Sequence, residues 1–170
     1  MRVSVLVVVA AAGLTLAGCG GGGDEPTPTG RSVEARVVRV VDGDTIVAQV
    51  DGHDTYVRYI GVDTPETVKP GTPVQCFGPQ ASAENHRLVE GRAVRLVFDR
   101  ERRDVYGRLL AYVYLPAAKG SGGSRFVNAT LVRGGWARTL TIAPNTAHAP
   151  LFNRLEQRAG KAGRGLWGKC

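Results

Sequence analysis

The sequence predicts a mainly β domain with helices, a small five-stranded Greek-key barrel of the OB type. Two observations lead to this fold class. Valine-rich stretches with interleaved charged residues recur along the chain, and Asp-Gly pairs separate the first three as in a β meander. A segment with apolar residues near helical spacing then stands between the third and the fourth stretch.

Five stretches carry the β pattern. They are residues 32–41, 45–50, 55–62, 93–98 and 109–115. Asp42-Gly43 and Asp51-Gly52 supply the turns between the first three. These stretches predict the strands of the barrel.

Three helices are expected, at residues 79–90, 128–133 and 150–162. Pro79 stands near the start of the first, where its missing N–H costs nothing, and Gly134-Gly135 ends the second. The third places apolar residues on one face, namely Phe152, Leu155, Ala159 and Ala162. The helices therefore supply apolar faces to cover the barrel.

Composition and charge narrow the class of protein. The chain has 170 residues, 22 Lys plus Arg and 15 Asp plus Glu, and a net charge of +7. With 43% hydrophobic residues it fits one globular domain, and three cysteines exclude a disulfide-rich scaffold. The basic excess indicates nucleic acid or an anionic surface as partner. Plain solubility explains the same charge, so charge alone does not decide.

The N-terminal segment has the features of an export signal. After Arg2, an apolar stretch too short for a confident membrane span ends in Leu16-Ala17-Gly18-Cys19. This ending resembles a bacterial lipobox, in which Cys19 is lipidated and becomes the new N-terminus. Ordinary secretory cleavage is the alternative. We therefore expect a lipoprotein signal peptide at 1–18, a Gly/Pro/Thr-rich tether at 19–30 and a folded domain at 31–170, exported and anchored by lipid to the cell envelope.

Three short motifs carry the candidate chemistry. They are Asp42-Gly43-Asp44-Thr45, Asp63-Thr64-Pro65-Glu66 and Asp104-Val105-Tyr106-Gly107-Arg108. Each alone is typical of a tight turn. Together they set carboxylates near strand ends, with Arg58 inside an apolar strand. A buried arginine needs an anionic partner, which is either a carboxylate in a core ion pair or a phosphate.

Carboxylates and a backbone carbonyl make an oxygen-only site for a hard cation, calcium before magnesium if the geometry is loose. A cation beside arginines neutralises the charge that develops on a phosphodiester. A further carboxylate orders or deprotonates the attacking water. The motifs thus predict a phosphodiester-cleaving site.

The motifs and their order resemble the staphylococcal nuclease, or thermonuclease, family. The resemblance includes Phe77-Gly78-Pro79-Gln80-Ala81-Ser82 and covers about residues 37–167. It implies an OB-fold with three helices and calcium-dependent cleavage of DNA and RNA, single-stranded or locally melted, that leaves 3′-phosphates. No protein partner is inferred, and a monomer is expected.

The resemblance also implies roles for individual residues. Asp44 and Asp63 match the calcium carboxylates, and Thr64 matches the residue that gives the metal a backbone carbonyl. Glu66 matches the general base, and Arg58 and Arg108 match the arginines that bind the scissile phosphate. Asp42 matches a supporting acid beside the metal, and Tyr106 a tyrosine near the terminal phosphate of the nucleotide.

The chain also departs from the family. Val105 stands where staphylococcal nuclease has a lysine, and residues 137–144 lack two tyrosines that flank the nucleotide there. We place the missing rings near Leu140 and Thr141, and expect weaker base stacking. The loop at 117–124 is longer than in the staphylococcal protein.

Two other functions compete with an enzyme: a noncatalytic OB module that binds nucleic acid, and a structural envelope lipoprotein. A noncatalytic module is expected to lack some of the predicted metal-binding and catalytic residues, which are Asp44, Arg58, Asp63, Glu66 and Arg108. All five are present, which favours the enzyme.

If Cys19 is lipidated, Cys76 and Cys170 remain in an oxidising compartment. Trp167 is expected to anchor the C-terminal tail near the loop that follows Glu66. We therefore predict a Cys76–Cys170 disulfide, with two free thiols as the alternative.

Overall fold

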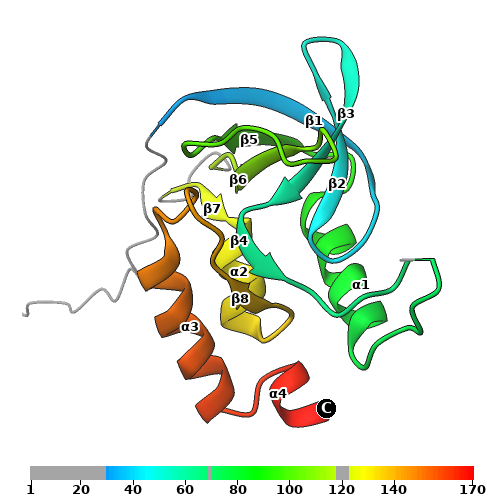
Figure 1. Ribbon diagram of the computed structural model, residues 1–170, viewed down its shortest axis with the longest axis vertical. Helices are drawn as coiled ribbons and strands as arrows, with labels where there is room; N and C mark the ends of the chain where they lie inside the picture. The colour runs from blue at the N-terminus through cyan, green and yellow to red at the C-terminus, as the bar shows by residue number, and fades with distance from the viewer. Residues whose placement is uncertain (1–29, 69, 118–122) are drawn as a thin grey trace, which may run out of the picture.

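The computed structural model describes residues 30–68, 70–117 and 123–170 (Figure 1). The expected signal peptide at 1–18, Cys19 and all of the 19–30 tether except Gly30 lie outside the described residues. So does most of the long loop at 117–124.

The described chain forms a closed five-stranded barrel, as predicted. Its strands are β1 (Ser32–Val40), β2 (Thr45–Val50), β3 (His53–Tyr59), β5 (Ala93–Val97) and β6 (Leu109–Leu115). β1 pairs antiparallel with β2 and β5, β2 pairs with β3, and β5 pairs with β6. A parallel pairing of β3 with β6 closes the barrel.

The expected third strand at 55–62 is two strands. β3 ends at Tyr59, and β4 (Gly61–Asp63) leaves the barrel to pair antiparallel with β8 (Arg138–Leu140). At the break, the Ile60 N–H donates to Ala111 O at 3.0 Å, and Ile60 O accepts from Asn128 Nδ2 at 2.9 Å. This bend carries Asp63 out of the barrel wall.

Three helices of eight or more residues lie below the barrel in Figure 1, where the sequence predicted helices: α1 (Gly78–Val89), α2 (Val127–Gly134) and α3 (Ala149–Lys161). The two-residue strand β7 (Arg125–Phe126) leads into α2, and a short fourth helix, α4 (Leu166–Lys169), ends the chain. Neither β7 nor α4 was expected. In the described part of the chain, no helix has both the length and the apolar character needed to cross a membrane.

The core fills the barrel and continues between the barrel and the helices. Barrel side chains such as Val37, Ile46 and Leu96 are at most 1% exposed. The predicted face of α3 buries Phe152, Leu155 and Ala159, whereas Ala162 is exposed because α3 ends before it. This core fixes the strand ends and loops that carry the three motifs.

Candidate active site

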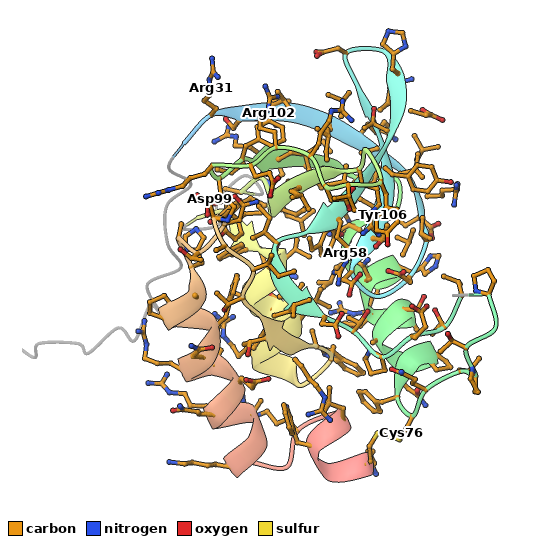
Figure 2. The ribbon with its side chains drawn as sticks, viewed as in Figure 1. Arg31, Arg58, Cys76, Asp99, Arg102 and Tyr106 are labelled. Carbon is orange, nitrogen blue, oxygen red and sulfur yellow. A yellow bond between two sulfur atoms is a disulfide. The ribbon has the colours of Figure 1, made fainter. Side chains whose placement is uncertain are left out.

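The three motifs meet in one small pocket of about 90 Å³ at the edge of the barrel. Its lining residues come from the β1–β2 loop, the start of β2, β3, the end of β4, the loop after β4 and the loop before β6. They are Asp42, Asp44, Thr45, Arg58, Asp63, Thr64, Pro65, Glu66 and Arg108. Figure 2 shows Arg58 and Tyr106 on the same side of the barrel. The structure therefore brings together every predicted metal and catalytic residue.

Asp44 lies at the centre of this pocket and is only 4% exposed. Its Oδ2 accepts from the Thr64 N–H at 2.7 Å and from Thr64 Oγ1 at 2.9 Å. Its Oδ1 accepts from Thr45 Oγ1 at 3.1 Å and pairs with Arg58 Nη1 at 2.7 Å. Four donors thus hold this buried carboxylate, and they make its desolvation tolerable.

Gly43 allows the β1–β2 loop to come this close to Thr64. A Cβ at Gly43 would lie 2.7 Å from the Thr64 side chain, closer than real Cβ contacts allow. The Asp42-Gly43 pair therefore does more than form a hairpin turn, since it seats Asp44 against the second motif.

Arg58 bridges the two expected metal carboxylates. Besides its contact with Asp44, its Nη2 donates to Asp63 Oδ1 at 3.0 Å and its Nη1 donates to Val62 O at 2.9 Å. The arginine side chain is 15% exposed. The ion pair that the sequence left as one of two alternatives is therefore present.

Asp42 holds the backbone of Asp44 and is itself held by Asn85. Its Oδ1 accepts from the Asp44 N–H at 3.0 Å, and its carbonyl accepts from Asn85 Nδ2 at 2.9 Å. Burial, and then the neighbouring Asp44 charge, raises the pKa of Asp42 to about 6. Burial also raises the pKa of Asp63, while Arg58 opposes that shift. The pocket is thus a site of concentrated negative charge that Arg58 partly neutralises.

Glu66 is held by its own loop. Its Oε1 accepts from the Thr67 and Val68 N–H groups, each at 2.9 Å. Its N–H donates to Gln75 Oε1 and its carbonyl accepts from the Gln75 N–H, both at 2.9 Å. Gln75 therefore fastens the far end of the loop at residues 66–77 to Glu66.

The next residue after Gln75 ties this loop to the end of the chain. Cys76 forms a disulfide with Cys170, with the two Cα atoms 6.0 Å apart. Figure 2 shows Cys76 beside the C-terminal helix α4. The structure thus contains the disulfide expected from the sequence.

Arg108 is oriented by Asp104, four residues earlier. Arg108 Nε lies 2.6 Å from Asp104 Oδ2, and the N–H groups of Arg108 and Tyr106 both donate to Asp104 Oδ1 at 3.0 Å. The Arg108 guanidinium carbon lies 5.4 Å from the centre of the Tyr106 ring. Tyr106 itself is 81% exposed. One carboxylate therefore shapes the turn and aims the arginine.

A larger cleft of about 360 Å³ adjoins the small pocket and shares Arg58 and Arg108 with it. Leu140 and Ile142 form part of its wall and are exposed, whereas Thr141 is not among its lining residues. Of the two positions considered for a missing ring, Leu140 lines this cleft and Thr141 does not. The positions that face this cleft are Leu140 and Ile142.

The oxygen-rich pocket fits a hard cation better than a soft one. Within residues 30–68, 70–117 and 123–170, no three His, Cys, Asp or Glu side chains are gathered into a ready-made metal centre. The expected ligands are two carboxylates and one backbone carbonyl, and Asp44 and Asp63 both reach Arg58. Such a small set of protein oxygens leaves the remaining coordination positions of a hard cation to water.

Three supporting residues were missed by the sequence analysis. Asn85 is fully buried, and its Oδ1 accepts from Tyr59 OH at 3.0 Å while its amide holds Asp42. Its signal was available, because it lies on the apolar face of α1 between Ala81 and Leu88. Asp104 was noted only as part of a turn, and Gln75 had no recognisable signal.

Comparisons with known proteins agree with this geometry. The family model of staphylococcal nuclease homologues matches residues 56–169. The thermonuclease of Staphylococcus intermedius is 44% identical over 131 residues, covering 77% of this chain and 74% of the relative. Endonuclease YncB of Bacillus subtilis is 41% identical over 139 residues, covering 81% of this chain and 63% of the relative. The chain therefore belongs to the staphylococcal nuclease homologue family.

Proposed function

We propose that this protein is a calcium-dependent nuclease that hydrolyses phosphodiester bonds of DNA and RNA and leaves 3′-phosphates. The observation that carries the proposal is the convergence of Arg58, Arg108 and four carboxylates on one pocket of about 90 Å³. The relatives named thermonuclease and endonuclease support the same activity.

The two arginines supply the anion-binding part of the site. A guanidinium offers several donors in a rigid fork that matches phosphate oxygens. Arg58 approaches from β3, and Arg108 approaches from the loop before β6, where Asp104 fixes its orientation. A phosphodiester between them would receive positive charge from both sides, and that charge gains value as the transition state becomes more negative.

Glu66 is the proposed general base. Two main-chain N–H groups hold its Oε1, and Gln75 holds its backbone, so the carboxylate has a defined position at the pocket wall. A carboxylate held within reach of a water molecule takes the proton that the water loses as it attacks phosphorus.

Asp44, Asp63 and the Thr64 carbonyl are the groups that would hold calcium. When bound, the ion neutralises charge on the phosphoryl oxygens. Arg58 already pairs with both carboxylates, so the cation and Arg58 compete for the same oxygens. This competition would release donors of Arg58 for the substrate. Calcium is favoured over magnesium for a separate reason, because calcium tolerates loose oxygen coordination whereas magnesium requires a near-ideal octahedron.

The proposal is tested by separating turnover from binding. Glu66→Gln keeps the shape of the side chain and removes the base, so kcat should fall by about 10²–10⁴-fold while nucleotide affinity is kept. The matched control is Glu90→Gln, since Glu90 lies at the end of α1 and pairs with His86. Loss of nucleotide affinity in Glu66→Gln, with kcat unchanged, would show that Glu66 organises the site and does not take the proton.

We also propose that the protein is exported and held at the cell envelope by a lipid on Cys19. The Leu16-Ala17-Gly18-Cys19 sequence supports this, and the glycine-rich stretch after it provides a tether. Metabolic labelling with a fatty acid should mark the full-length protein and leave Cys19→Ser unmarked. Equal labelling of the two would place the lipid elsewhere, and no labelling of either would favour ordinary secretion.

A further inference from the structure

A second cleft lies on the other side of the Tyr106–Arg108 turn. It has a volume of about 270 Å³, and its walls come from β3 and from the loop before β6. Tyr106 and Arg108 line both this cleft and the larger one of about 360 Å³. A chain bound across the small pocket at Arg108 therefore has a hollow on each side of it.

Tyr56 forms the β3 wall of the second cleft and presents an aromatic ring to it. The side chain is 47% exposed. Arg39 Nη2 donates to Tyr56 OH at 2.9 Å, and its guanidinium carbon lies 5.5 Å from the ring centre. The ring is thus held in place by a neighbouring strand while a large part of it stays open to solvent.

The same ring has a structural duty. Val47 lies between Arg39 and Tyr56 in the strand register and is only 4% exposed, although it is outside the barrel core. The Arg39–Tyr56 pair therefore covers Val47. A test of binding must separate this cover from any contact with a ligand.

Arg103 adds positive charge to the opposite wall. It is exposed, and its Nη1 donates to Gly107 O at 2.5 Å, which ties the guanidinium to the turn that carries Arg108. Asp54 is the acidic residue of the cleft. An aromatic face beside arginines is the combination that single-stranded nucleic acid recognises, because bases stack on rings and phosphates pair with cations.

We propose that the second cleft binds one nucleotide of a single strand whose scissile phosphate lies at Arg108 and whose neighbouring nucleotide, on the other side of that phosphate, lies in the larger cleft. The base in the second cleft stacks on Tyr56, and the backbone of that nucleotide lies near Arg103. This inference rests on the proposed nuclease function, since it takes a single strand as the ligand. It makes the site an extended one, in which affinity grows when the strand passes Arg108 in both directions.

The test compares a short and a long ligand by calorimetric titration in calcium. All proteins carry Glu66→Gln, so that the ligands survive, and the ligands are deoxythymidine 5′-phosphate and a single-stranded DNA hexanucleotide. Tyr56→Leu keeps an apolar cover over Val47 but cannot stack, whereas Tyr56→Phe keeps the ring. Arg158→Ala on α3 is the control for the loss of one positive charge in Arg103→Ala, and thermal unfolding of each variant records any structural effect.

Tyr56→Leu should weaken hexanucleotide binding by roughly 5–100-fold and leave mononucleotide binding unchanged. Tyr56→Phe, which keeps the ring, should bind the hexanucleotide as tightly as the protein with Tyr56. Arg103→Ala should weaken hexanucleotide binding more than Arg158→Ala does. It should also lower the magnitude of the slope of log affinity against log salt concentration by about 0.7. Hexanucleotide binding that is unchanged in Tyr56→Leu, or lost equally for both ligands, would overturn the inference. These readouts need no cleavage, so a protein that binds in this way but never cuts would contradict the proposed activity alone.

Discussion

The disulfide between Cys76 and Cys170 should stabilise both the fold and the loop that holds Glu66. The two cysteines are 94 residues apart, so the bond closes most of the domain into one loop. Replacing both with serine, or reducing the native protein, opens this loop in the unfolded chain. The unfolded state then gains conformational freedom that the native state does not.

The size of the effect follows from the loop length. For 94 residues, the chain-entropy relation gives an entropy term near 16 cal/mol/K, or about 4.7 kcal/mol at 25 °C. With a midpoint change of about 2–4 °C per kcal/mol for a domain of this size, we expect Tm to fall by roughly 10–20 °C. The measurement is urea and thermal unfolding of the native protein and of the Cys76→Ser/Cys170→Ser double variant.

The same change should reach the active site. Cys76 follows Gln75, whose two hydrogen bonds position Glu66, so the open loop should lower kcat at temperatures where the variant is still folded. The reduced native protein should behave like the double variant. A stability loss of about 0.5 kcal/mol or less, as for an ordinary surface substitution, would refute the reasoning. Unchanged kcat would show that Gln75 holds Glu66 without help from the bond.

Three further outcomes are expected. Ile142→Tyr, and to a lesser degree Leu140→Tyr, should tighten binding of a mononucleotide, by up to about 1–3 kcal/mol per stacked base, whereas Thr141→Tyr should not, as calorimetry can check. Arg58→Ala should lower the free energy of unfolding in chelator by about 3–5 kcal/mol, because Asp44 is left buried without its cation; a loss near zero would mean that the pair is not needed for stability. Burial against Tyr112 lowers the pKa of His148, so the unfolded chain takes up a proton below pH 6.5 before the native state does. The contribution of His148 to the free energy of unfolding should therefore fall from pH 6.5 downward, whereas the raised pKa of Asp42 acts in the opposite direction. Relative to the native protein, His148→Gln should therefore gain stability as the pH falls below 6.5, and a difference that does not change with pH would contradict the assignment.

Much of the barrel could be predicted because its signals are local. Valine-rich strands and Asp-Gly turns mark β1 to β3 directly. The break at Ile60 could not be predicted in the same way, since it depends on Asn128 and Ala111, which are remote in sequence. The strands β7 and β8 have only two and three residues, too few for a periodic pattern.

In the candidate site, too, the residues in local motifs could be predicted and those that act through remote contacts could not. Asp44, Asp63 and Glu66 stand in short motifs of adjacent residues that can be recognised in the sequence, and Arg58 is conspicuous within an apolar strand. The sequence left Leu140 and Thr141 as alternatives for a missing ring, although the alternation of side chains in extended backbone puts Leu140 and Ile142 on one face. Gln75 acts through contacts that only the folded chain creates.

The central claim is that the Asp44, Asp63 and Arg58 pocket supports calcium-dependent cleavage of nucleic acid. The most direct measurement incubates the full-length protein with single-stranded DNA in calcium, in magnesium, or in a calcium chelator, and then analyses the ends of the fragments. The account predicts cleavage in calcium, far slower cleavage in magnesium, none in chelator, and fragments that end in 3′-phosphates. Cleavage that persists in chelator, equal rates with the two ions, or intact DNA in calcium would contradict it.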